Sequence, residues 1–351
     1  HPVAHSFPTR RSSDLGVFLV LKMFAMQPYA GDEHIYLFQG RLVSEGVAPY
    51  SGFAMAHPPL QALFTAALLE TFGYHFLLGR LLPVLWCLAG GILLGLLMRR
   101  ELGALAAVVA MALALLAYEP LRASSHFTGV NMTIALLLGG VLALRARATR
   151  TAALLCALAV LTRLYAAPGV LAVTAFTLLA DRREGLRLIA WGAGFGAAAF
   201  LAVGLWTGLG DMLHNMVAYH AQKTPMDAEK LDNMQATVLF HNAIPAGLFA
   251  LSLVAMLAVL RRAVRATNPR DRRARRLRRA IEASGLSLPL LGALTAGLFL
   301  VVLLNLDRVW MYYFVPAFPF AAICGGRLVA RWRDAALALV HAVRARRLEP
   351  A

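Results

Sequence analysis

The chain has 351 residues, of which 60% are hydrophobic and only 15% are charged. A soluble domain of this size could not bury so much apolar surface in one core, so a soluble globular fold is excluded. The formal net charge of +16 comes from basic residues in short clusters between apolar runs, a pattern that favours cytoplasmic membrane loops over a nucleic-acid-binding face.

The N-terminal segment differs in character from the rest of the chain. Residues 5–15 (HSFPTRRSSDL) resemble the in-frame translation of a common sequencing-library adapter, and a genuine basic region ahead of a first span is the alternative. We therefore interpret residues 1–15 as non-native sequence and leave them out of functional reasoning. The apolar piece that follows, residues 16–29, is short for a complete span and is interpreted as a truncated first helix.

Apolar stretches recur along the remaining chain, most of them long enough for a membrane crossing. They predict an all-α fold, a polytopic transmembrane helical bundle of about ten spans with the first one truncated. The further predicted spans are residues 77–98, 104–119, 128–145, 151–163, 165–180, 188–207, 243–260, 287–304 and 311–330.

The basic residues orient this bundle. With the N-terminus in the cytoplasm, the arginine clusters fall on the inside at every loop, as the positive-inside rule requires. Counting residues 58–73 as a span would move the arginine block of residues 261–279 outside, so we predict an interfacial helix there instead. Residues 16–330 then form one transmembrane domain in the cell (inner) membrane, and residues 331–351 form a basic cytoplasmic tail.

The first outer loop carries the most informative residues. Asp32 and Glu33 follow the first span directly, with no basic neighbour in sequence before Arg41. Adjacent carboxylates at a membrane surface are costly unless water or a pocket receives them. They form either an ordinary acidic loop or a functional pair. A functional pair would act as general base on an acceptor hydroxyl or hold a divalent cation, Mg²⁺ or Mn²⁺, at Asp32.

The loop continues with a predicted interfacial helix over residues 33–46, where apolar side chains recur at near-helical spacing before a Gly and a Pro. Tyr50 follows this helix. His57 stands before two prolines, which hold its backbone extended at the entrance of the next helix. A solvated loop histidine is the ordinary interpretation, and binding of a phosphate at the helix N-terminus is the functional one.

Arginines in apolar surroundings are the other candidates. Residues 151–180 must make two passes, yet thirty residues give only about 45 Å of helix. The turn that contains Arg163 therefore lies at membrane depth, where a guanidinium needs an anionic partner or snorkels to the surface. Arg80 faces the same choice, and its place near a helix start favours snorkelling. Asp307 and Arg308 either pair with each other or contribute to a site.

The order of these motifs resembles the opening loop of GT-C glycosyltransferases: Asp32-Glu33, then Tyr36, a Gly-x-x-Pro-Tyr that ends at Tyr50, and a His-Pro-Pro-Leu that begins at His57. The most similar families are the dolichyl-phosphate-mannose–protein mannosyltransferase-like proteins and the aminoarabinose transferases, in which a basic residue before Pro-Pro recurs. Three further segments fit the pattern: residues 80–97, 159–173 and 307–326.

This resemblance implies inverting sugar transfer from a polyprenyl-phosphate donor at the extracytoplasmic face. It implies that Asp32 is the catalytic carboxylate or a metal-site residue, with Glu33 beside it. The residues that would contact the carrier phosphate are His57, Arg163 and Arg308. Those that would line the cavity are Tyr50, Tyr312 and Asn131. Asn131 stands where some relatives have an acidic residue, and this departure leaves the subfamily open.

The expected partners are a polyprenyl-phosphate-linked sugar, a lipid, glycan or protein acceptor, and membrane lipids, with no nucleic acid. The leading rival is a secondary transporter, which predicts inverted repeats and interrupted helices at the midplane, and we find no convincing repeat. A polysaccharide polymerase or a lipid-linked-oligosaccharide ligase is a nearer rival. It would favour a basic large outer loop, whereas residues 208–242 carry both signs of charge.

Overall fold

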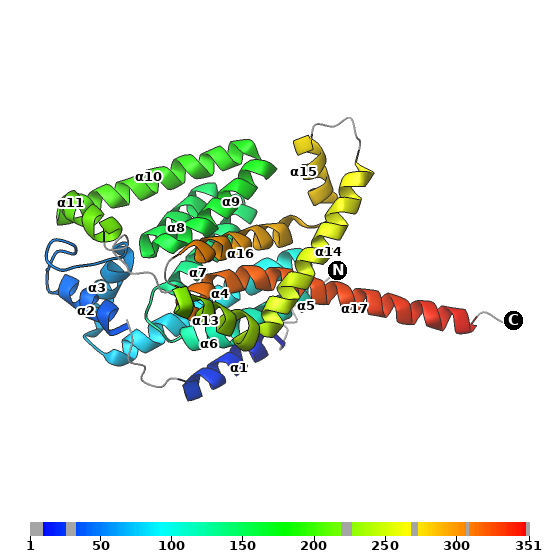
Figure 1. Ribbon diagram of the computed structural model, residues 1–351, viewed down its shortest axis with the longest axis horizontal. Coiled ribbons are helices and arrows are strands. Elements are labelled where there is room, and N and C mark those ends of the chain that lie inside the picture. Colours follow the sequence, from blue (N-terminus) through cyan, green and yellow to red (C-terminus); the bar gives the residue numbers. More distant parts are fainter. Residues whose placement is uncertain (1–9, 26–32, 219–226, 268–272, 307–308, 349–351) are drawn as a thin grey trace, which may run out of the picture.

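The computed structural model describes residues 10–25, 33–218, 227–267, 273–306 and 309–348. Over these residues the chain forms helices joined by short turns, without a β-strand, which confirms the predicted all-α class (Figure 1). In chain order the elements are α1 (Arg10–Ala25), α2 (Glu33–Ser44), α3 (Leu60–Phe72), α4 (Phe76–Leu102), α5 (Ala104–Leu115), α6 (Tyr118–Ala123), α7 (Val130–Arg145), α8 (Thr149–Thr162), η1 (Leu164–Ala166), α9 (Ala167–Ala180), α10 (Arg182–Thr207), α11 (Leu209–Leu213), η2 (His214–Ala218), α13 (Asp227–Gln235), η3 (Ala236–His241), α14 (Ala243–Ala266), α15 (Arg273–Ala283), α16 (Ser287–Asn305), η4 (Met311–Ala317) and α17 (Phe318–Leu348).

Every predicted span from residue 77 onward contains one of these helices. Within the described residues, five helices are long and apolar enough to cross a membrane on their own: α4, α10, α14, α16 and the η4–α17 unit. Shorter apolar helices fill the other predicted spans. Large apolar side chains of α10 and α14 point outward, among them Leu205, Ile244 and Leu257. These faces need hydrocarbon around them, so the protein is a multi-pass membrane protein.

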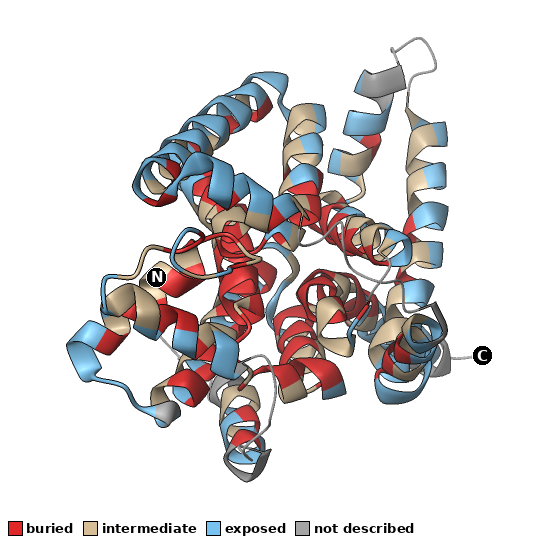
Figure 2. Ribbon diagram, turned by 60° about the vertical axis from the view of Figure 1, so that its left-hand side comes forward, coloured by how far each residue is buried: buried red, intermediate tan, exposed pale blue. Residues whose placement is uncertain are grey.

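The helices of the bundle pack closely because small residues stand at their crossings. At Gly326 of α17, an added Cβ would lie 2.5 Å from the Ala106 carbonyl oxygen of α5. At Gly140 of α7, it would lie 3.1 Å from the Cys156 Sγ of α8. Such positions let helix backbones approach without bulky side chains between them, as is usual in membrane bundles. Buried residues accordingly concentrate in the middle of the bundle, and the outer helices are exposed (Figure 2).

The two ends of the bundle differ in structure. One end, here called the α2–α3 end, carries α2, α3, α11 and the loop of residues 45–59 (Figure 1). Helices α2 and α3 pack on each other there, where the sequence predicted interfacial helices. At the other end, α17 projects past the bundle (Figure 1). It continues unbroken through residue 330, and its side chains from residue 331 to residue 343 are exposed.

The first helix begins before the predicted truncated span. Helix α1 starts at Arg10, inside the segment interpreted as adapter sequence, and residues 26–29 of the predicted span lie outside the described residues. Phe18 of α1 is fully buried and packs with Val84 and Leu115. The helix is therefore docked on the bundle through its apolar part.

Candidate functional site

The tip of the α8–α9 hairpin carries Arg163. Helix α8 ends where the backbone of Arg163 becomes extended (φ −151°, ψ 128°), and Pro168 helps to begin α9 just after the short η1 turn. The side chain of Arg163 is only 2% exposed. The guanidinium therefore stays inside the protein, which excludes the alternative of snorkelling to its surface.

Neutral groups hold the Arg163 guanidinium. Its Nη2 donates a hydrogen bond to Gln61 Oε1 at 2.8 Å. Its Cζ lies 4.2 Å from the centroid of the Tyr36 ring, which is a cation–π contact. Within the described part of the chain, Arg163 makes no ion pair with a carboxylate. Its Nε is buried without a hydrogen-bond partner there. A buried cation in such a setting is a candidate for binding an anion.

Tyr36 links Arg163 to His57. A hydrogen bond of 3.0 Å joins the Tyr36 hydroxyl to His57 Nε2. The Tyr50 hydroxyl donates to the His57 carbonyl at 2.8 Å, and its burial raises the pKa of this phenol. Tyr50 has a positive φ of 69°, so the loop bends sharply where it returns to α3. Three residues of the first outer loop thus lie in one group against the hairpin tip.

Further tyrosines surround the guanidinium. Tyr165 of η1 and Tyr312 of η4 both lie close enough to Arg163 to interact with it electrostatically. The ring of Tyr313 lies 6.0 Å from that of Tyr165 and 4.8 Å from that of Tyr312. The Tyr165 hydroxyl is buried without a hydrogen-bond partner among the described residues, which leaves a donor next to the cation.

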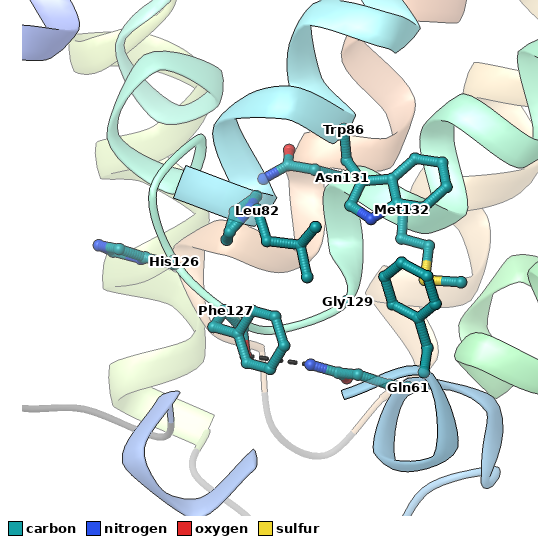
Figure 3. A pocket seen from close by; sticks show the side chains of 10 residues that line it. Gln61, Leu82, Trp86, His126, Phe127, Gly129, Asn131 and Met132 are labelled. Atoms are coloured by element: carbon teal, nitrogen blue, oxygen red, sulfur yellow. Dashed lines mark hydrogen bonds between the residues drawn. The ribbon is translucent and has the colours of Figure 1, made fainter. Parts of the chain in front are cut away.

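Asn131 takes a separate position. Its Nδ2 donates to the Ala123 carbonyl at 3.0 Å and ties α7 to the end of α6. It also lines a small cavity with Gln61, Trp86 and His126 (Figure 3). Burial, followed by nearby cations, lowers the pKa of His126 to about 4, so this ring is uncharged at neutral pH.

Two of the predicted site residues, Asp32 and Arg308, lie outside the described residues. Glu33 begins α2, and its side chain is also outside the description. The start of α2 is nevertheless placed, because Tyr36 one turn later contacts both His57 and Arg163. Among the described residues, no group of three or more His, Cys, Asp or Glu side chains could hold a metal ion.

Sequence reasoning missed several residues of this site. Gln61, Tyr36 and Tyr165 contact or neighbour Arg163, and none of them was among the predicted site residues. Tyr36 and Tyr165 do lie in segments that carry the family resemblance, whereas Gln61 does not. The only signal for Gln61 was its place at the start of the helix that follows the two prolines. Arg80 also differs from expectation: it is 3% exposed rather than snorkelling, because its helix turn is covered by neighbouring elements.

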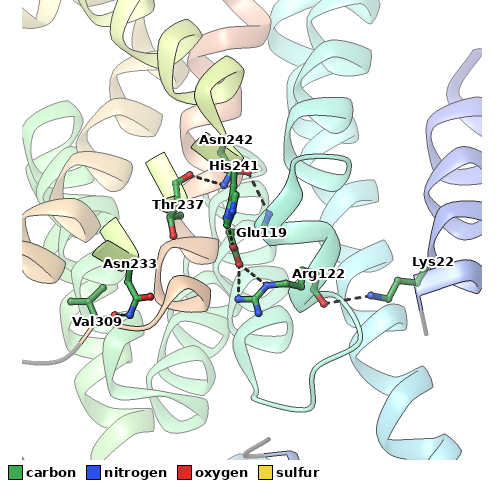
Figure 4. Close-up of polar contacts among 8 residues, drawn as sticks. All are labelled: Lys22, Glu119, Arg122, Asn233, Thr237, His241, Asn242 and Val309. Atoms are coloured by element: carbon green, nitrogen blue, oxygen red, sulfur yellow. Dashed lines mark hydrogen bonds and ion pairs between the residues drawn. The ribbon is translucent and has the colours of Figure 1, made fainter. Parts of the chain in front are cut away.

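A second polar cluster lies around Glu119, which is completely buried in α6 (Figure 4). Glu119 Oε2 accepts hydrogen bonds from Arg122 Nε and Nη2 at 3.0 and 2.8 Å. Its Oε1 lies 3.4 Å from His241 Nδ1, and its backbone N–H donates to Asn242 Oδ1. Lys22 Nζ donates to the Leu121 carbonyl at the end of α6. This cluster joins α1, α6 and the start of α14, and it holds its own countercharge.

Comparison with known proteins adds to this geometry. The family model described as "Glycosyltransferase family 87" matches residues 56–291. The fold is similar to that of ArnT from Cupriavidus metallidurans in two crystal structures. In the one bound to undecaprenyl phosphate, the TM-score is 0.64 at 20% identity. In the apo state, the TM-score is 0.63 at 21% identity.

Each of these alignments covers 91% of this chain and 59% of ArnT, so the chain spans less than two thirds of that protein's length. At such identities the likeness establishes a shared membrane fold. No curated protein matches the chain in sequence.

Proposed function

Because the chain belongs to glycosyltransferase family 87, we propose that it is an integral-membrane, inverting glycosyltransferase that uses a polyprenyl-phosphate-linked sugar as donor. The acceptor is a lipid, a glycan or a protein. The family match and the ArnT-like fold support the predicted GT-C resemblance. They favour a transferase over the transporter and the polymerase or ligase that the sequence left as alternatives.

The observation that carries the proposal is the charge environment of the buried Arg163. Among the described residues, an amide and an aromatic face hold this guanidinium and no carboxylate cancels its positive charge. The phosphate of a lipid carrier can pair with such a cation, because two phosphate oxygens accept hydrogen bonds from two N–H groups of one planar guanidinium. The ArnT structure bound to undecaprenyl phosphate has the same fold and supports this ligand class.

The proposed reaction uses few groups. An acceptor hydroxyl or amine attacks the anomeric carbon of the sugar, and Asp32, with Glu33 beside it, takes the proton. The bond between that carbon and the phosphate oxygen breaks, and the carrier phosphate leaves with the bonding electrons. Positive side chains stabilise the charge that grows on the leaving phosphate. We assign this role to Arg163, with His57 and Arg308.

The position of the site supports an extracytoplasmic reaction in the cell membrane. Arg163 contacts Tyr36 of α2 and Gln61 of α3, whereas the opposite end of the molecule carries the exposed basic side chains of α17, including Arg331 and Arg333. The positive-inside rule puts that basic end in the cytoplasm. A lipid donor then keeps its tail in hydrocarbon while its sugar reaches the outer aqueous face. Binding of Mg²⁺ or Mn²⁺ at Asp32 stays a prediction, because Asp32 lies outside the described residues, and no step here depends on it.

Membranes that contain the protein, incubated with a panel of labelled polyprenyl-phosphate sugars, test the proposal. We expect transfer from at least one donor and its loss in Asp32→Asn. A matched control is Asp211→Asn, which removes a carboxylate from α11 at the same end of the molecule. Absence of transfer from every donor, or full turnover by Asp32→Asn, would contradict the assignment.

A further inference from the structure

Gln61 is held at both ends of its side chain. It lies in the first turn of α3 and is 6% exposed. Its Oε1 accepts from Arg163 Nη2 at 2.8 Å, and its Nε2 donates to the Phe127 carbonyl at 3.1 Å. A carbonyl accepts only from the amide nitrogen and a guanidinium donates only to the amide oxygen, so this orientation is unique. Gln61 therefore ties Arg163 to the turn between α6 and α7.

The backbone of that turn closes directly over the pair. Gly129 precedes α7 with a φ of +74°, a conformation that suits glycine. A Cβ added there would lie 2.6 Å from Gln61 Oε1 and 3.0 Å from Arg163 Nε. The glycine thus leaves room for the amide and the guanidinium to meet beside the turn. Figure 3 shows the Gln61 amide and its hydrogen bond to Phe127.

The choice of an amide has an electrostatic consequence. A carboxylate at this position would bond to the guanidinium more strongly and would also cancel its charge. An amide orients the same group through a neutral oxygen. Since no described carboxylate cancels this buried charge, an anion bound beside it would offset the cost of its burial.

We propose that Gln61 is a positioning residue that makes the Arg163 site selective for a phosphate-bearing lipid, because it fixes the Arg163 guanidinium without neutralising it. This inference rests on the proposed function and deepens it. Gln61 acts through Arg163 and does not contact the reacting atoms.

The decisive variant is Gln61→Glu, which keeps the size and reach of the side chain and adds one negative charge. Purified protein in nanodiscs is titrated with a polyprenyl phosphate and with the corresponding polyprenol. We expect affinity for the phosphate to fall at least about tenfold, since one charge-assisted contact is lost, and affinity for the polyprenol to stay unchanged. The matched control is Gln39→Glu. Gln39 is a 9% exposed glutamine of α2 that donates to the Ala54 carbonyl and does not contact Arg163.

The outcomes separate the inference from the proposed function. If the unaltered protein binds polyprenol as tightly as polyprenyl phosphate, the proposed function fails. If it prefers the phosphate and Gln61→Glu retains that preference, the inference about Gln61 is overturned.

Gln61→Met tests the same inference if Gln61→Glu does not fold, because methionine keeps the side-chain volume and lacks the acceptor oxygen. We then expect the KM for donor to rise about fivefold with the KM for acceptor unchanged. Equal changes in the two constants would indicate a structural role only and would overturn the inference.

Discussion

Two arginines of this protein meet their partners in opposite ways. Arg122 forms a two-pronged ion pair with the fully buried Glu119, so its charge is satisfied within the chain. Arg163 is buried against Gln61 and Tyr36, and no described carboxylate pairs with it. The first arrangement neutralises a buried carboxylate within α6, and the second leaves a charge that we propose a ligand satisfies. The difference predicts that one arginine matters for stability and the other for donor use.

The largest expected effect is the loss of stability in Arg122→Ala. Removal of the guanidinium leaves Glu119 buried without its main countercharge, which costs about 3 kcal/mol. Thermal unfolding in detergent measures it. Arg41→Ala is the control, because its pair with Glu45 is exposed on both sides, and we expect little change there. If Arg122→Ala lowered donor use and left thermal stability unchanged, the contrast between the two arginines would be lost.

The next effect is on catalysis. Arg163→Ala should lower kcat/KM for the donor about 100-fold, as expected when a group that stabilises developing charge is lost. Arg163→Lys should recover little of it, because an ammonium cannot both bond to Gln61 and stack on Tyr36 as a planar fork does. Initial rates at varied donor and fixed acceptor give the value. An equal decrease in kcat/KM for the acceptor would count against a phosphate role.

A smaller effect is expected from Tyr36→Phe. This change keeps the ring under Arg163 and removes only the hydroxyl that bonds to His57. One hydrogen bond corresponds to a decrease of at most about tenfold in donor kcat/KM. Tyr74→Phe is a suitable control, since Tyr74 lies on exposed surface beside Arg41. A loss as large as that of Arg163→Ala would show that the hydroxyl, and not the ring, is the important part.

The smallest effect concerns pH. His126 lies near Arg122, Lys22 and Arg80, and its pKa falls from 6.5 to about 4 in the folded protein. Between these values the unfolded chain binds a proton that the folded protein does not, so stability decreases as pH falls through this window. Melting temperatures at about pH 7 and about pH 5 should differ less in His126→Gln than in the unaltered protein. An unchanged difference would assign the pH response to another group.

The sequence predicted the spans well because apolar length is a local property, as in α4 and α16. It also drew attention to Arg163, since a charge inside an apolar hairpin is conspicuous. It could not find Gln61, because the contact with Arg163 joins residues 102 positions apart. It misjudged Arg80, whose burial depends on which elements cover the start of α4.

Asn131 illustrates the limit of motif comparison. Its alignment with an acidic residue of relatives predicted a place in the donor cavity, and this assignment remains a prediction. In the fold its amide bonds to the Ala123 carbonyl, and the residue lines a small cavity together with His126 and Gln61, the partner of Arg163. A motif gives the residue type at a position, whereas the tertiary contacts decide which groups the side chain meets.

Arg163 directly follows the last residue of α8, so the length of that helix determines the height of the guanidinium along the helix axis. Each residue of a helix adds about 1.5 Å of height, so under the proposed role of Arg163 the length of α8 would set the level at which the donor phosphate binds. Contacts that fix only the height of the phosphate do not depend on the length of the isoprenoid tail beyond it. Donors with short and long isoprenoid chains should therefore serve equally well, while one residue inserted into α8 would lift and turn the guanidinium away from its ligand.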